Sequence, residues 1–177
     1  TPGDADLDAQ IGGTTFDANF APDFYLTFGH NGTDTFFNFA ELLTGGGGEG
    51  LFVGSIPNTG GTVSASTPVG GRNVSLGYAL NNSNTAGVSD TTTTGAAAVT
   101  TGIELSINLD AIDAIGEVFN VAAFINNTDH DFASNQVLAG LGGGVGNLGN
   151  DPDFSTISGD QFFTVVPEPA TLGLMLL

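Results

Sequence analysis

The sequence predicts an all-β fold, an antiparallel β-sandwich of the jelly-roll type with at most one short helical turn. About nine short segments alternate apolar and polar residues at intervals of roughly 8 to 15 residues, which is the spacing of β-sandwich strands. The composition supplies turns between them, with 28 Gly and with 14 Asp against 5 Glu. Asp favours turns and caps over helix interiors.

The clearest hairpin is expected near the start of the chain. Residues 23–29 (DFYLTFG) and 33–42 alternate apolar and polar side chains, and successive side chains of a strand point to opposite faces. Asn31-Gly32 between them is a typical hairpin turn. The residues expected to share the core-facing side are Phe24, Leu26, Phe28, Phe37 and Phe39.

The remaining strands are predicted from apolar patterning between turn signals; residues 117–126 are apolar on both faces, as expected of a central strand. Further strands are expected over residues 50–56, 62–69, 73–80, 99–109, 117–126, 136–141 and 160–166. The strand at 99–109 alternates most strictly, with Ile103, Leu105, Ile107 and Leu109 pointing inward. Residues 110–115 can form one helical turn, with Asp110 as N-cap and Gly116 as the stop. Residues 1–22 are expected to be loop that ends in a short strand, and residues 81–95 a long exposed loop.

The charge is strongly one-sided. The formal net charge is −18, and Arg72 is the single Lys or Arg residue. Nucleic acids and anionic membrane surfaces are therefore poor partners, because both require clustered basic residues, and no nucleic-acid partner is expected. The 177 residues contain no Cys, so disulfides do not stabilise the fold. This length favours one domain, predicted over residues 1–166, followed by an apolar tail at 167–177.

The tail begins at an abrupt boundary. Pro167, Glu168 and Pro169 exclude both a helix and a central strand, because each proline fixes its own φ and lacks a backbone donor. The uncharged residues 170–177 follow, far fewer than the roughly 20 that a membrane helix requires. Leu172, Leu174 and Leu176 alternate with period two, which suits an extended strand.

Residues 166–177 (VPEPATLGLMLL) resemble the start of a PEP-CTERM sorting signal. The resemblance implies an exported bacterial protein of the cell surface or biofilm matrix, with a signal peptide already removed and an exosortase-like enzyme as processing partner. Members of this family continue into an apolar span and an Arg-rich end, whereas this sequence stops within the apolar run. The body loosely resembles other members and, more distantly, carbohydrate-binding sandwich modules.

Three carboxylates near the start form a candidate calcium site. Asp4, Asp6 and Asp8 have the spacing that opens a calcium loop, and calcium prefers oxygen ligands. A complete EF-hand loop would need Gly and Glu where this chain has Ala9 and Thr15, so the EF-hand interpretation fails. A simpler calcium site and a solvated acidic terminus stay as the two alternatives.

No catalytic motif stands out, and the chain is predicted not to be an enzyme. It has no Cys, no Lys and no Gly-x-Ser-x-Gly sequence. His130 lies between Asp129 and Asp131, where it either holds a metal or packs in a polar loop. The only other histidine is His30, which is expected in a turn. A pair of carboxylates for glycoside hydrolysis cannot be recognised in sequence, because it depends on their separation in space.

Modification with sugars is a further expectation. The candidate O-linked sites are Thr91, Thr92, Thr93 and Thr94, and Asn-x-Ser/Thr sequons occur at Asn31, Asn73, Asn81 and Asn126.

Two functions follow from these observations. The first is a non-catalytic extracellular structural protein, a homopolymer or matrix component joined through its apolar tail into a filament. The second is a carbohydrate-binding module associated with exopolysaccharide. Such modules usually present exposed aromatic rings, yet this chain has no Trp, and its 14 Phe mostly fall at strand positions.

Overall fold

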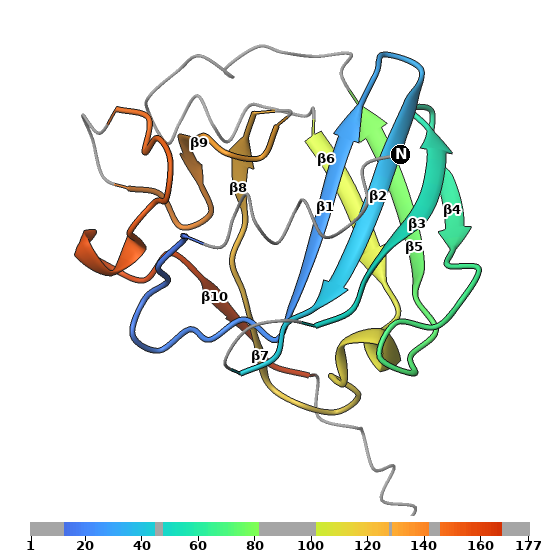
Figure 1. Cartoon of the computed structure of the whole chain (residues 1–177), viewed down its shortest axis with the longest axis horizontal. Coiled ribbons are helices and arrows are strands. Elements are labelled where there is room, and N and C mark those ends of the chain that lie inside the picture. Colours follow the sequence, from blue (N-terminus) through green and yellow to red (C-terminus); the bar gives the residue numbers. More distant parts are fainter. Residues whose placement is uncertain (1–12, 45–47, 82–101, 128, 142–145, 168–177) are drawn as a thin grey trace, which may run out of the picture. The chain divides into compact units, whose positions relative to one another are not determined.

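The computed structural model describes residues 13–44, 48–81, 102–127, 129–141 and 146–167. This part of the chain forms ten strands and two short 3₁₀ helices, without any α-helix (Figure 1). The strands form four small antiparallel sheets, which confirms the all-β prediction. The chain divides into two units, unit 1 (Thr1–Ala9 and Pro22–Ile112) and unit 2 (Gln10–Ala21 and Asp113–Leu177). The prediction of a single domain over residues 1–166 stays a prediction. The two units are defined by close contacts within each of them, and such contacts do not show whether either unit folds independently of the other.

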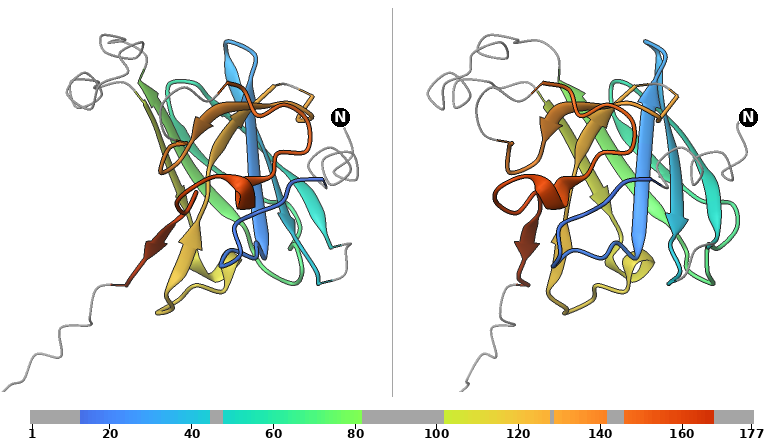
Figure 2. Two further views of the ribbon diagram at one scale, coloured as in Figure 1. Left: turned by 90° about the vertical axis from the view of Figure 1, so that its left-hand side faces the viewer. Right: turned by 60° about the vertical axis from the view of Figure 1, so that its left-hand side comes forward.

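The first sheet of unit 1 has the order β1-β2-β3, with strands at Phe24–His30, Asp34–Glu41 and Gly50–Pro57 (Figures 1 and 2). The predicted hairpin is confirmed by the register, which pairs Leu26 with Phe39 and Phe28 with Phe37. Its turn is fixed by Asn31, whose Oδ1 accepts hydrogen bonds from the backbone N–H groups of Thr33 and Asp34 at 3.0 and 2.9 Å.

A β-bulge in β3 lets two residues of different parity reach the core. The pairing with β2 shifts between Phe37 and Asn38, so that Gly54 lies opposite Phe37 and Phe52 opposite Asn38. The extra residue is Val53, which is buried, as is Ile56 three residues later. Strict alternation would place these two side chains on opposite faces, so the bulge is what buries both.

The second sheet of unit 1 has the order β4-β5-β6, with strands at Gly61–Ser64, Ser75–Asn81 and Gly102–Ile107. The 3₁₀ helix η1 (Leu109–Ile112) follows β6. The polar side chain of Asn108 ends the strand, because its Oδ1 accepts from the Ser75 N–H and its Nδ2 donates to the Asn73 carbonyl, at 2.7 and 2.9 Å. These bonds attach the end of β6 to the start of β5.

Both sheets of unit 1 contribute to one apolar core. Its buried members are Phe37, Phe39, Val53, Ile56, Val69, Val74, Leu76, Tyr78 and Ala111. The ring of Phe37 meets the ring of Tyr78 edge-on, with centroids 5.3 Å apart, so that β2 and β5 are in direct contact. Such aromatic pairs stabilise a core beyond the burial of their surface area.

Unit 2 contains two two-stranded sheets and an aromatic cluster. Strand β7 (Phe119–Val121) pairs with β10 (Phe163–Val165), and β8 (Phe124–Asn126) pairs with β9 (Ala133–Val137). The second 3₁₀ helix, η2, is at Phe154–Thr156. Sheets this small are marginal by themselves. The rings in contact are Phe16 with Phe20 and Phe154, Phe20 with Phe162, and Phe124 with Phe154, at centroid distances of 5.2 to 5.9 Å.

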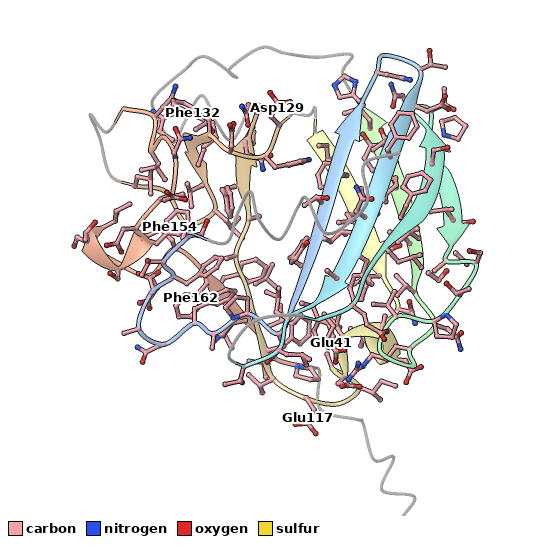
Figure 3. The ribbon with its side chains drawn as sticks, in the orientation of Figure 1. Glu41, Glu117, Asp129, Phe132, Phe154 and Phe162 are labelled. Carbon is pink, nitrogen blue, oxygen red and sulfur yellow. The ribbon has the colours of Figure 1, made fainter. Side chains whose placement is uncertain are left out.

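The cluster also joins distant parts of the sequence within unit 2. Phe154 is buried and, with Phe162, is labelled in Figure 3. Thr15 forms a parallel bridge with Asp153, and Asp17 Oδ2 accepts a hydrogen bond of 2.7 Å from the Gln161 N–H. Phe16 and Phe20 of the N-terminal segment thus pack against residues of the C-terminal half of the described chain.

Several predicted elements are shorter than expected or divided. The strand expected over 117–126 is two strands, because the chain changes partner from β10 to β9 within it. The strand at 136–141 ends at Val137, since Ala139 and Gly140 adopt positive φ values of 68° and 74°. The strands at 62–69 and 160–166 shorten to β4 and β10. In residues 13–22, an isolated bridge at Thr15 replaces the expected short strand.

The predicted helical turn is displaced. It begins at Leu109 instead of after Asp110, so Asp110 lies inside the first turn and is not the N-cap. The turn ends before Asp113, which has a positive φ of 50°. Leu109, expected to point inward as part of a strand, belongs to this helix and is exposed.

Candidate functional site

Most of the predicted site residues lie outside the part of the chain that the structure describes. This applies to Asp4, Asp6 and Asp8, to Thr91–Thr94, and to Glu168, Pro169, Leu172, Leu174 and Leu176. Pro167 is described and lies two residues after β10 ends. The calcium, glycosylation and tail-docking predictions therefore stay predictions.

Within residues 13–44, 48–81, 102–127, 129–141 and 146–167, no three His, Cys, Asp or Glu side chains gather closely enough to hold a metal ion. His30 lies at the end of β1, and its Nδ1 accepts a 3.3 Å hydrogen bond from the Gly32 N–H. It therefore takes part in its own hairpin turn.

His130 lies in the loop between β8 and β9, next to Asp129, which Figure 3 labels. Its Nδ1 is 2.9 Å from the Asn126 Nδ2. An amide nitrogen only donates, so this contact requires an unprotonated Nδ1. Asn127 holds the rest of the loop, because its Oδ1 accepts from the N–H groups of Asp131 and Phe132 at 3.1 and 3.2 Å. These contacts describe a folded polar loop.

Burial lowers the pKa of His130 below its ordinary value of 6.5, and Asp129 opposes this effect without cancelling it. The folded state consequently binds a proton less readily than the unfolded state. This contribution to stability is present above pH 6.5 and is lost as the pH falls through the lowered pKa of the folded protein.

We expect His130→Asn to reduce the loss of stability between pH 8 and pH 5. Asn does not titrate, and it tolerates the positive φ of 58° at this position. Urea unfolding at the two pH values measures the effect, with His30→Asn as the matched control. An identical pH dependence in His130→Asn and in the original chain would contradict the assignment.

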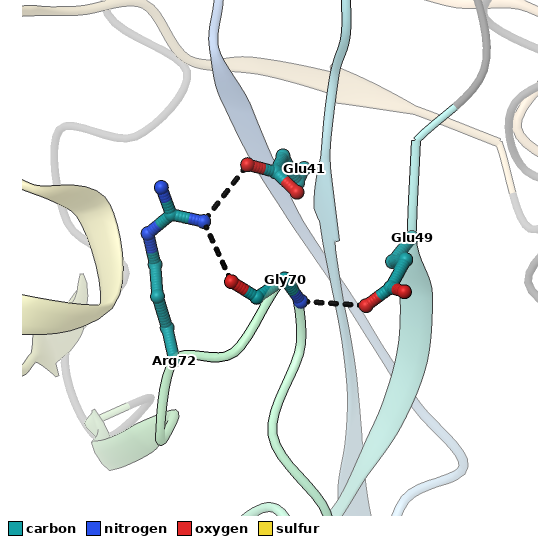
Figure 4. A network of polar contacts seen from close by, with 4 residues as sticks. All are labelled: Glu41, Glu49, Gly70 and Arg72. Carbon is teal, nitrogen blue, oxygen red and sulfur yellow. Dashed lines mark hydrogen bonds and ion pairs between the residues drawn. The ribbon is translucent and has the colours of Figure 1, made fainter.

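Arg72 lies at one end of the core of unit 1, in a small polar network (Figure 4). Its Nη1 donates to Glu41 Oε1 at 2.8 Å and to the Gly70 carbonyl at 3.3 Å. Its guanidinium carbon also lies 5.2 Å from the centroid of the Phe24 ring. Glu49 accepts a 2.7 Å hydrogen bond from the Gly70 N–H. The basic residue thus connects β1, β2 and the turn before β5.

The most unusual surface of unit 1 is apolar and is formed by Phe28 of β1 and Ile103 and Leu105 of β6. We call these three residues the uncovered edge. Their side chains are 37%, 50% and 38% exposed. The register pairs Leu105 with Tyr78 and Ile103 with Leu80, so both share the core-facing side of their sheet. Phe28 pairs with the buried Phe37 and lies 6.2 Å from the Tyr78 ring.

The uncovered edge exists because β1 and β6 are the end strands of their sheets. Each pairs with one neighbour, and no other described strand pairs with its second edge. Side chains on such a strand face the core, and among the described residues no further paired strand lies beyond them. The sequence prediction identified the face of Ile103 and Leu105 correctly and their burial wrongly.

Two site features were not visible in the sequence. The pairing of Arg72 with Glu41 joins residues 31 positions apart, and no local pattern predicts it. The exposure of β6 depends on its place at the end of a sheet, which strand alternation does not report. The nearest signal of such exposure in the sequence is an apolar strand that is not joined to another strand by a short hairpin turn.

No protein-family model, curated protein or solved structure matches this chain. In the described residues, no helix has both the length and the apolar character needed to cross a membrane.

Proposed function

We propose that the chain is a non-catalytic structural protein of the cell surface or extracellular matrix, and that its copies join through the apolar C-terminal segment into a filament. The observation that carries the proposal is the uncovered edge, where Phe28, Ile103 and Leu105 expose apolar side chains on end strands. Apolar end strands are prone to pair with another chain. In a structural protein of the matrix, pairing of this kind would join one copy to the next, and this joining is the function that we propose.

The charge of the chain supports an apolar junction. With 19 acidic residues against one basic residue, copies repel one another, and salt bridges between copies cannot offset this. The three side chains of the uncovered edge carry no charge, and residues 170–177 carry none either. Assembly through these parts places no like charges in the contact itself, so apolar burial there can offset the repulsion between the copies.

The proposed fold and location belong to the same account. The core shared by two three-stranded sheets supports a jelly-roll-like β-sandwich in unit 1. The resemblance of residues 166–177 to a PEP-CTERM signal supports export, with an exosortase-like enzyme as a processing partner.

Electron microscopy of the purified chain tests the proposal. We expect filaments from residues 1–177 and dispersed particles from a chain that ends after Val166. A full-length variant with Leu172, Leu174 and Leu176 replaced by Ser is the matched control. It keeps the length of the chain and removes the apolar face, so it separates the effect of that face from the effect of truncation. Equal assembly of all three chains would refute the proposal.

A carbohydrate-binding module is the second candidate, and one observation favours it. The rings of Phe36 and Phe52 lie 6.4 Å apart, and the register places them on the side of their sheet opposite Phe37. Phe36 is 37% exposed, and Asn38, the partner of Phe52, shares this side. Aromatic rings with neighbouring amides suit stacking against sugars. Binding to a glycan panel that disappears in Phe36→Ala would favour this candidate.

A further inference from the structure

We infer that β6 is the receptor strand of the junction, and that it accepts residues 170–177 of a second copy as an added strand. The inference rests on the proposed function and adds the acceptor and the register. Leu174 of one copy lies beside Leu105 of the other. Both partners present three apolar residues with period two.

The receptor is β6 because its core-facing row is the less covered of the two end strands. Ile103 and Leu105 are exposed, and Ile107 is partly buried against the core. On β1, in contrast, Phe24 and Leu26 pack against the core as partly buried residues, and Phe28 is the one exposed apolar side chain of that row. A strand added beside β6 would therefore cover more apolar surface.

The rows of the sheet show where the added side chains would go. The cross-strand pairs of β5 and β6 are Leu76 with Ile107, Tyr78 with Leu105, and Leu80 with Ile103. Each pair is a row that ends at β6. A further strand extends all three rows, since directly opposite side chains on neighbouring strands are in contact.

The donor fits these rows in length and pattern. Leu172, Leu174 and Leu176 place three apolar side chains on one face, at the same two-residue spacing as Ile103, Leu105 and Ile107. Both central residues meet whether the added strand runs parallel or antiparallel to β6. The other face of the donor carries Thr171 and Gly173 first and then Met175 and Leu177, and it would lie on the same side of the sheet as Glu104 and Ser106 of β6.

Cysteine cross-linking tests the register, since the natural chain has no Cys to interfere. One full-length chain carries Leu105→Cys and a second carries Leu174→Cys, and the two are mixed under mild oxidation while assembly is followed by light scattering. The control pair replaces Leu105→Cys by Ser106→Cys, whose side chain points to the opposite face. We expect the mixed disulfide of 105 with 174 in about tenfold excess over that of 106 with 174.

The outcomes separate the inference from the proposed function. Assembly with equal or absent disulfides for both pairs overturns the inference and leaves the proposed function standing. Absence of any assembly by cysteine-free chains overturns the proposed function itself. A double variant, Leu105→Cys with Leu174→Cys, that closes within one chain at high dilution overturns the second copy as occupant. Mixed disulfides at 105 and 174 that appear together with assembly support the inference.

Discussion

Replacing Phe37 with Ala is expected to destabilise unit 1 by about 3–5 kcal/mol, the usual cost of removing a buried Phe side chain. Phe37 is fully buried at the centre of β2. Its ring contacts the rings of Phe28 and Tyr78, with centroids 6.0 and 5.3 Å away. The loss therefore includes contacts with β1 and with β5, and the hydrophobic core cannot close over the space.

The neighbouring residue provides the matched control. Phe36 has the same chemistry and points to the opposite face, where it is 37% exposed. We expect Phe36→Ala to cost about 1 kcal/mol or less. Urea unfolding measures both changes, followed by the combined fluorescence of Tyr25 and Tyr78. Equal losses from the two substitutions would contradict the register of β1, β2 and β3.

Replacing Gly54 with Ala is the second large expected effect, at about 2–5 kcal/mol from backbone strain together with overpacking. Gly54 has a φ of 146° in the bulge of β3, a conformation that side chains other than glycine rarely adopt. A Cβ atom at this position would also lie 2.5 Å from the Val63 Cγ2 of β4. Both costs arise at the same point, where β3 approaches β4.

Two further variants separate these costs. Gly71 also has a positive φ, 79°, but no atom within 4 Å of the added Cβ, so Gly71→Ala reports backbone strain alone. Val63→Ala removes the obstructing methyl group, and combining it with Gly54→Ala should recover the overpacking part. Unfolding free energies of the single and double variants complete the cycle. A strictly additive double variant would argue against the contact.

The two halves of the chain differ in how well local pattern predicts them. The strands β1, β2, β3 and β5 are all predicted to within two residues of their ends. Each has seven or eight residues, and outside the bulge of β3 its core-facing residues alternate because one face meets the shared core. The segment 117–126 lacks that simple relation, since its two short strands pair with different partners. An apolar run in the sequence indicates that the segment is buried, but it does not indicate which strand will pair with that segment.

The same limit applies to the candidate site. The alternation of Ile103, Leu105 and Ile107 predicts a common face, and the register confirms it. Whether that face is covered depends on the number and order of strands in the sheet, which are long-range properties. The bulge at Val53 is likewise hidden, because GLFVGSIP reads as an ordinary strand with two glycines. Sequence therefore predicts the common face of these β6 residues but not their exposure.

Hydrogen exchange of the backbone amides before and after assembly shows whether β6 accepts a strand from a second copy. We expect the amides of β6 (Gly102–Ile107) to exchange at least about tenfold more slowly in the assembled material. Strand β4 (Gly61–Ser64), the opposite end of the same sheet, should exchange as before and is the internal control. If assembly leaves the exchange of β6 unchanged, β6 is not the acceptor.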